Sequence, residues 1–364
     1  MGARLVPLNE VCRKRSSNLR LKDVINGKEG PYPVYGASGI VGYSRSYQID
    51  QEYVAVVKDG AGVGRVLKCE ANSSVLGTLQ PIVPADSVNR DYLFSVLETL
   101  DLAKYTSGST IPHIYFKDYR KELIPYLDRA GQNLLAGRFR TINRALGACN
   151  SLIERFDLLV KSRFTEMFGD LSVNDKNWQM TKLSEICDVR DGTHASPKYC
   201  KTGYPLMTSK NFSQGFADFS SARLISQDDF EVIDRRSRVD TGDIVMPMIG
   251  TIGHPVIIRS NRKFAIKNVA LFKMESSQIN AACLKALLES DYFSRAVKSS
   301  NRGATQKFIS LGSIRALPVP IIPEHIQGAF AELVAQVDKL RFDVQQQIEK
   351  LETLKKSLMQ EYFG

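Results

Sequence analysis

The sequence lacks long hydrophobic runs and paired cysteines. It contains no stretch of about eighteen apolar residues, so no transmembrane helix is expected, and its first ten residues have no apolar signal core. The six cysteines are scattered over 364 residues without a Cys-x-x-Cys spacing. This pattern argues against a disulfide framework or a zinc site and favours reduced thiols, so we expect a cytoplasmic protein.

Motifs of catalysis are also missing. The four histidines do not have the paired spacing of a metal site, and neither Gly-x-Ser-x-Gly nor Pro-Pro occurs. Without Pro-Pro there is no Asn/Asp-Pro-Pro-aromatic motif of the amino-methyltransferases. Residues 60–64 are rich in glycine but lack the Lys-Ser/Thr of a phosphate-binding loop, which favours a tight turn. We therefore expect a protein that is not itself an enzyme and that holds no metal and no cofactor.

Basic residues are in excess. The chain has 49 Lys and Arg against 39 Asp and Glu, a net charge of +10. Most of the excess lies in residues 171–321, which carry 21 basic and 14 acidic side chains. This distribution favours a polyanionic partner whose phosphates are attracted independently of sequence.

Three segments recur in the same order along the chain. Residues 8–15 resemble 183–190, residues 108–125 resemble 303–320, and residues 161–169 resemble 356–364. The last two pairs share a separation of 195 residues, while the first pair is separated by 175. Such a long period is typical of a duplicated domain rather than of a solenoid.

Each copy predicts a mixed α and β fold (α+β) followed by a long helix. Apolar or β-branched runs at 52–58, 80–84, 243–250 and 269–274 are typical of buried strands. Residues 91–105 and 280–297 have helical spacing and occupy comparable places in the two copies.

The long helices, expected at about 130–168 and 324–362, contain apolar residues at alternating steps of three and four. Such heptads predict a coiled coil, and since neither helix is stable alone with so long an apolar stripe, we expect them to pair with each other. Arg163 and Gln347 each occupy one polar position of the pattern. The predicted seam consists of Phe139, Ile142, Leu146, Ile153, Phe156, Val160, Phe330, Leu333, Val337, Leu340, Val344, Leu351, Leu354 and Leu358.

Motifs in both copies resemble the specificity subunit of type I restriction-modification systems. In the first copy these are YPVYGASGIVGY (32–43), KDGAGVGRV (58–66) and LGTLQPIV (76–83). In the second they are DGTHASPKY (191–199), GYPLMTSKNF (203–212), VDTGDIVMPMIGTIGHPVII (239–258), AIKNVALF (265–272) and GATQKFISLGSIRALPVPIIP (303–323). The closing KSRFTEMFG and KSLMQEYFG resemble the ends of the two helices of that family.

The resemblance implies a division into four segments. Residues 1–125 and 171–321 would be target recognition domains, each reading one half of a split DNA site. Residues 126–170 and 322–364 would be long helices that pair antiparallel, set the spacer between the half-sites and dock two modification subunits.

The resemblance also implies where catalysis takes place. The modification subunits would bring S-adenosylmethionine-dependent adenine-N6 methylation. Restriction subunits would bring ATP- and Mg-dependent translocation and cleavage. The specificity subunit itself would catalyse nothing.

Motif position and polar chemistry together give candidate contacts with double-stranded DNA, because such side chains read base edges and hold phosphates. The candidates are Tyr35, Ser38, Tyr43, Lys58 and Arg65 in the first copy, and Thr193, His194, Lys198, Lys210, Asn211, Lys267, Asn268 and Lys307 in the second.

Two other classes of protein stay open. One is the recognition half of a fused restriction and methylation enzyme, which a nuclease or methyltransferase motif would favour. The other is a coiled-coil scaffold without a role on DNA, which would show no salt-dependent DNA binding.

Overall fold

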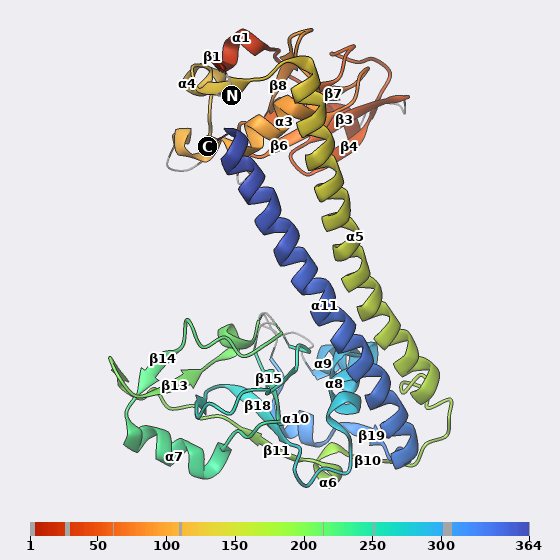
Figure 1. Cartoon of the computed structure of the whole chain (residues 1–364). Coiled ribbons are helices and arrows are strands. Elements are labelled where there is room, and N and C mark those ends of the chain that lie inside the picture. The colour runs from red at the N-terminus through yellow and green to blue at the C-terminus, as the bar shows by residue number, and fades with distance from the viewer. Residues whose placement is uncertain are drawn as a thin grey trace. The chain divides into compact units, whose positions relative to one another are not determined.

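The computed structural model describes residues 4–25, 30–60, 62–108, 111–213, 215–249, 252–300 and 308–363. The chain forms two compact units (Figure 1). Unit 1 contains Met1–Asn150 and Gln345–Gly364, and unit 2 contains Ser151–Val344. No helix in the described ranges combines the length and the apolar character needed to cross a membrane.

The globular part of unit 1 is built from short strands and helices. Its elements are β1 Arg4–Pro7, α1 Leu8–Val11, β2 Cys12–Lys14, α2 Leu21–Ile25, β3 Tyr32–Gly36, β4 Gly39–Ser44, β5 Tyr53–Val57, β6 Val66–Cys69, β7 Ser74–Val75, β8 Leu79–Pro84, α3 Arg90–Thr99, the 3-10 helix η1 Leu102–Tyr105, α4 Phe116–Tyr119 and β9 Leu123–Tyr126.

The globular part of unit 2 follows the same plan with additions. Its elements are β10 Met180–Lys182, α6 Leu183–Ile186, β11 Asp188–Asp191, β12 Tyr199–Cys200, β13 Tyr204–Met207, the 3-10 helix η2 Ser209–Phe212, β14 Arg223–Ile225, α7 Gln227–Ser237, β15 Ile244–Pro247, β16 Val256–Ile257, β17 Ala265–Ile266, β18 Val269–Lys273, α8 Ala281–Glu289, α9 Asp291–Ser300, α10 Leu311–Arg315 and β19 Pro318–Pro320. The two long helices are α5 Arg129–Phe168 and α11 Glu324–Phe363. The predicted strands and long helices are therefore present. The predicted helical segments 91–105 and 280–297 are each divided in two, into α3 and η1 and into α8 and α9.

Sheet order shows the duplication directly. A four-stranded antiparallel sheet has the order β2-β8-β5-β6 in unit 1 and β11-β18-β15-β16 in unit 2. Each unit has a further sheet with one parallel pair. β3 pairs in parallel with β7 in unit 1, and β13 pairs in parallel with β17 in unit 2. The central strands β5 and β18 are buried along their whole length, which explains why they read as continuous apolar runs.

The ends of the long helices complete the hydrophobic cores. In unit 1, Phe139 of α5 stacks on Phe363 of α11 with ring centroids 6.0 Å apart, and both contact a core that includes Leu93 of α3. In unit 2, Phe168 of α5 and Phe330 of α11 lie 5.2 Å apart in the core.

The two helices run in opposite directions within unit 2. Arg341 of α11 pairs with Asp157 of α5 at 2.7 Å, whereas the earlier residue Phe330 contacts the later residue Phe164. Residue numbers therefore rise along one helix where they fall along the other, as expected for an antiparallel pair.

The burial of α11 differs from the prediction in one of the two rows of residues that make up the seam. The predicted row is Leu333, Leu340, Gln347 and Leu354. Leu340 is 50% exposed and Leu354 is 48% exposed, whereas Ile348 is only 7% exposed. The buried or half-buried row begins one residue later than predicted and consists of Val334, Arg341, Ile348, Lys355 and Tyr362.

The shift has a physical reason. Either row satisfies the spacing of three and four, and hydrophobicity alone favours the leucines. Arg341 and Lys355 can occupy the seam because a long side chain can be partly buried while its charged end is paired. Their side chains are 33% and 20% exposed, and their charged ends pair with Asp157 and Glu98.

On α5 the predicted seam positions are buried or half-buried, and Phe164, next to the predicted polar position Arg163, is 5% exposed.

Candidate nucleic-acid interface

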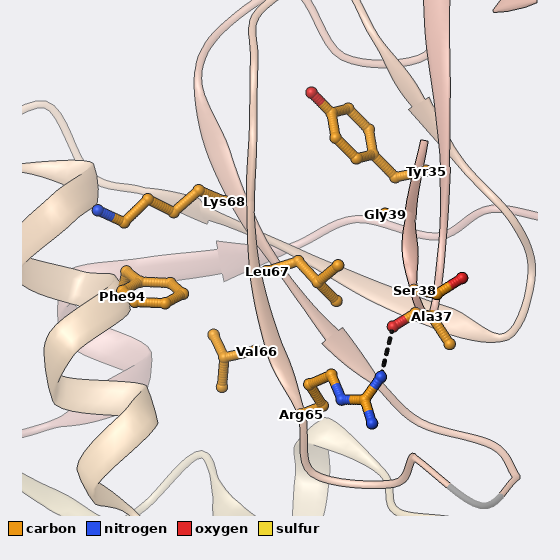
Figure 2. Close-up of a pocket in the computed structure, with 9 residues that line it drawn as sticks. All are labelled: Tyr35, Ala37, Ser38, Gly39, Arg65, Val66, Leu67, Lys68 and Phe94. Carbon is orange, nitrogen blue, oxygen red and sulfur yellow. Dashed lines mark hydrogen bonds between the residues drawn. The ribbon is translucent and has the colours of Figure 1, made fainter. Parts of the chain in front are cut away.

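Two turns of unit 1 meet at one edge of its sheets (Figure 2). Because β3 and β7 are parallel, with Tyr35 opposite Val75, their carboxyl ends lie at the same edge. The β3–β4 turn at this edge contains Ala37 and Ser38. Nη1 of Arg65, from the β5–β6 turn, donates a hydrogen bond of 3.1 Å to the carbonyl oxygen of Ala37. The bond brings an exposed hydroxyl and an exposed guanidinium to one place.

Ile114, within the repeated segment 108–125, lies against the β5–β6 turn. The N–H of Ile114 donates to the carbonyl oxygen of Lys58 at 2.9 Å. In unit 2 the N–H of Ile309, which follows Ile114 by 195 residues, donates to the carbonyl oxygen of Met248 at 3.0 Å. The support beneath this turn is therefore part of the duplication.

Three of the five candidates in the first copy come together. Lys58 opens the β5–β6 turn that Arg65 closes, since the N–H of Val57 donates to the carbonyl oxygen of Arg65 at 2.8 Å. Ser38 is joined to this turn because its neighbour Ala37 accepts the hydrogen bond from Arg65. Tyr43 is exposed, but it lies toward the other end of β4, about 15 Å along the chain from Ser38.

Tyr35 is a core residue of unit 1. Its side chain is 7% exposed, and its hydroxyl accepts a hydrogen bond of 3.3 Å from the N–H of Glu70. Burial raises the pKa of Tyr35 above its ordinary value. In Figure 2 the hydroxyl points away from Arg65 and Ser38. Tyr35 therefore supports the β3–β4 turn from the core side and does not join the exposed groups at the edge.

Four candidates of the second copy form one polar cluster at the matching edge of unit 2. Thr193 bridges in parallel to Lys267, and the N–H of Asn268 donates to the carbonyl oxygen of Thr193 at 3.2 Å. Nδ1 of His194 lies 2.8 Å from Oδ1 of Asn268. Asn268 has a φ of 56°, a left-handed conformation that asparagine tolerates better than most side chains. The turn after β17 therefore holds the loop that follows β11.

Asp191 joins this cluster to helix α7. Its carboxylate lies 2.8 Å from Nε2 of His194 and 2.5 Å from Nη2 of Arg236 on α7. Burial alone would raise the pKa of Asp191, but the hydrogen bonds from His194 and Arg236 outweigh it and lower the pKa below its ordinary value. Asp191 and Arg236 are not among the candidates that the sequence motifs give. The spacing of three between Asp191 and His194 could have indicated the first, whereas the place of Arg236 depends on how α7 packs.

Two lysines lie at this edge, Lys198 in the loop 192–198 and Lys267 in the turn after β17. Nζ of Lys267 donates to the hydroxyl of Ser196 at 2.7 Å, and Lys198 is exposed. Lysine ammonium groups at the edge of a loop suit contacts with phosphate oxygens.

Asn211 has a structural place. It is 4% exposed, and its Oδ1 accepts from the N–H of Thr208 at 2.8 Å while Nδ2 donates to the carbonyl oxygen of Asp218 and the hydroxyl of Ser221, both at 3.1 Å. Its polar group is thus used within the protein. The neighbouring Lys210 is exposed, and Lys307 lies outside the described residues.

A polar hollow on unit 2 is a separate feature. Its lining includes Arg190, Arg238, Asp240, Asp243 and Lys273. The charges of both signs pair with one another there, so the hollow presents no single sign to a ligand. Within the described residues, no group of three or more His, Cys, Asp or Glu side chains is placed to hold a metal ion.

Comparison with protein families decides the class of this protein. Residues 175–353, which contain the whole unit 2 cluster, match a family described as "Type I restriction modification DNA specificity domain". The chain belongs to the type I restriction-modification specificity subunits. It is a DNA sequence-recognition subunit, and catalysis in these systems lies in partner subunits. The resemblance seen in the sequence is therefore confirmed.

Curated relatives agree with this assignment. The specificity subunit of the type I restriction enzyme MjaVIII from Methanocaldococcus jannaschii is 22% identical over 85% of this chain and 78% of its own length. The specificity subunit of the type I restriction enzyme EcoBI from Escherichia coli is also 22% identical, over 95% of this chain and 78% of its own length.

Solved structures show the same fold. The specificity subunit from M. genitalium matches with a TM-score of 0.63 at 14% identity, over 99% of this chain and 96% of that chain. A chain from a study of assembly and conformational transition in a type I restriction-modification system matches with a TM-score of 0.55, also at 14% identity, over 99% and 97% of the two chains.

Proposed function

We propose that this specificity subunit reads a bipartite DNA site, with one half-site bound by residues 1–125 and the other by residues 171–321. The observation that carries this proposal is the duplicated edge. In each unit, a parallel pair of strands, β3 with β7 or β13 with β17, ends beside polar turns. Each unit also contains a four-stranded antiparallel sheet of the same order. The turns themselves differ in sequence, so the two copies would read different bases.

The proposed contacts follow from exposure and grouping. Lys58, Arg65, Lys198, Lys210 and Lys267 would hold phosphates, because their cationic groups lie at or beside the two edges. Ser38, Thr193, His194 and Asn268 would approach base edges. Tyr35 and Asn211 would support the turns instead of touching DNA.

Residues 126–170 and 322–364 would set the spacer and dock two modification subunits. Exposed leucines on both helices, including Leu158 at 66% and Leu340 at 50%, support a partner surface there. The partner subunits would use S-adenosylmethionine for methylation, and restriction subunits would use ATP and Mg. We place the assembly in the cytoplasm, as the free cysteines suggest.

The spacer role is tested by shortening both helices. Residues 340–346 are removed together with 152–158, the stretch that contains Asp157, the partner of Arg341. Seven residues span about 10 Å of helix, and base pairs rise 3.4 Å along DNA, so the preferred spacer should shorten by about three base pairs. The recognised half-sites should stay the same.

The measurement is a map of methylated sites in cells that contain the cognate modification subunit. An active deletion variant with an unchanged spacer would reject the proposal. Altered half-site bases would show instead that the helices take part in base readout.

A further inference from the structure

A buried glutamine stands at the start of each long helix. Gln132 lies in the first turn of α5 and is 0% exposed, and Gln327 lies in the first turn of α11 and is 7% exposed. The two residues are separated by 195 positions, the separation found for the repeated segments.

In unit 1 the amide of Gln132 makes three hydrogen bonds to the backbone. Oε1 accepts from the N–H of Asn89 at 2.7 Å. Nε2 donates to the carbonyl oxygens of Ser87 at 3.2 Å and Leu127 at 2.9 Å. Ser87 and Asn89 belong to the turn before α3, while Leu127 belongs to the turn before α5.

In unit 2 the amide of Gln327 has the same partners in the duplicated chain. Oε1 accepts from the N–H of Asn280 at 2.6 Å. Nε2 donates to the carbonyl oxygens of Gln278 at 3.1 Å and Ile322 at 2.9 Å. Gln278 and Asn280 follow Ser87 and Asn89 by 191 residues, and Ile322 follows Leu127 by 195 residues.

Each glutamine therefore joins two helix starts. The side chain of Asn89 caps α3, and the side chain of Asn280 caps α8. The glutamine amide holds these caps against the turn that leads into the long helix. Only a carboxamide supplies an acceptor and two donors in one planar group, so neither an apolar side chain nor a carboxylate can make all three bonds.

We propose that Gln132 and Gln327 are positioning residues that fix the angle at which each long helix leaves its recognition domain, and thereby make the subunit strict about spacer length. This inference rests on the proposed role of the helices in setting the spacer. A helix held loosely on its domain lets the reading turns reach half-sites at neighbouring spacings. A helix held by three hydrogen bonds to the backbone at each junction restricts the reading turns to half-sites at one spacing.

The test compares Gln132→Leu and Gln327→Leu with the parent chain in the assembled methyltransferase. Gln132→Glu and Gln327→Glu are second variants that keep the acceptor, lose both donors and set a buried carboxyl oxygen against two backbone carbonyl oxygens. Gln336→Leu is the matched control, since Gln336 is an exposed glutamine on α11. The substrates are duplexes with the parent half-sites, once mapped, at the native spacer and at one base pair more or fewer.

The measured quantity is the methylation rate at the native spacer divided by the rate at the altered spacers. We expect this ratio to fall about tenfold in the Leu variants, a change that the loss of one or two hydrogen bonds can produce. It should fall at least as much in the Glu variants and stay unchanged in Gln336→Leu, with the same half-site bases in all.

An unchanged ratio in an active Leu or Glu variant would overturn the inference. Failure of all four variants to assemble would also overturn it, because the glutamines would then serve folding alone. The helix deletion described above separates the two proposals. If it shifts the preferred spacer while the glutamine variants keep the parent's ratio of rates, the positioning role of the glutamines is rejected and the spacer role of the helices is kept.

Discussion

Nζ of Lys273 lies 2.5 Å from Oδ2 of Asp243, and both side chains are buried in unit 2. The same ammonium lies 2.6 Å from Asp240. Burial alone would lower the pKa of Lys273, but the two carboxylates outweigh it and raise the pKa. The pKa of Asp240 is lowered, chiefly by its hydrogen bond from Lys273. Lys273 and Asp240 are thus charged in the folded state.

Removal of the cation should destabilise unit 2. Lys273→Met leaves Asp243 buried without its charged partner, and breaking a buried pair in this way costs about 3 kcal/mol or more. Thermal unfolding of the purified chain measures the loss. Lys285→Met is the control: its pair with Glu289 is partly exposed, so this change should cost less than about 1 kcal/mol. Equal losses would contradict the prediction.

The effect of Lys273→Met should depend on pH. Asp240, whose pKa is lowered on folding, stabilises the parent above its ordinary value of 3.8, and this contribution disappears as the pH falls through the folded pKa. Lys273, whose pKa is raised, stabilises the parent below 10.5, and this contribution disappears as the pH rises through the folded pKa. The stability difference between parent and variant should therefore be largest between these limits. A difference that stays constant at acid pH would contradict this.

Lys58→Ala and Lys210→Ala should each weaken DNA binding by the assembled methyltransferase. A lysine that holds one phosphate contributes about one unit to the slope of log affinity against log salt, so each variant should reduce the slope by about one. Lys201→Ala is a suitable control, since Lys201 is exposed at the opposite end of β13 from Lys210. Unchanged affinity and slope in both variants would remove them from the interface.

His194→Ala should relax base preference in one half-site only. The ring is held between Asp191 and Asn268 at the unit 2 edge, and loss of one specific base contact reduces discrimination by about 1–3 kcal/mol. Methylation mapping shows which half-site changes. His325→Ala is the control because His325 is exposed on α11. A changed preference in both half-sites would count against separate reading by the two copies.

Ile348→Ala should destabilise the chain more than Leu340→Ala. Ile348 is buried, so truncation costs about 2–5 kcal/mol, whereas Leu340 is half exposed and should lose less than about 1 kcal/mol. Thermal unfolding of both variants decides the matter. The opposite order would restore the seam that the sequence predicts.

The sequence predicts the repeat, the fold class and the long helices because these depend on local periodicity. It cannot choose between two seam rows with equal spacing, since the choice depends on whether Arg341 and Lys355 find Asp157 and Glu98 on other elements. A helix pattern contains no information about such partners.

The candidate site shows the same limit. The motifs select His194 and Asn268, which the structure brings together from positions 74 residues apart. They also select Tyr35 and Asn211, whose polar groups bond within the protein. Side-chain type alone does not distinguish a polar group that faces solvent from one that supports a turn.

The contact of Phe363 with Phe139 bears on how the chain folds during synthesis. Unit 2 is one continuous stretch, so it can fold soon after it leaves the ribosome. Unit 1 needs residues 345–363, and its bond between Arg138 and Tyr362 joins positions 224 residues apart. At a synthesis rate of about 5–20 residues per second, the first core would wait tens of seconds or less for its last helix. During that interval the apolar surface around Phe139 and Leu93 lacks the cover that Phe363 gives it in the folded chain.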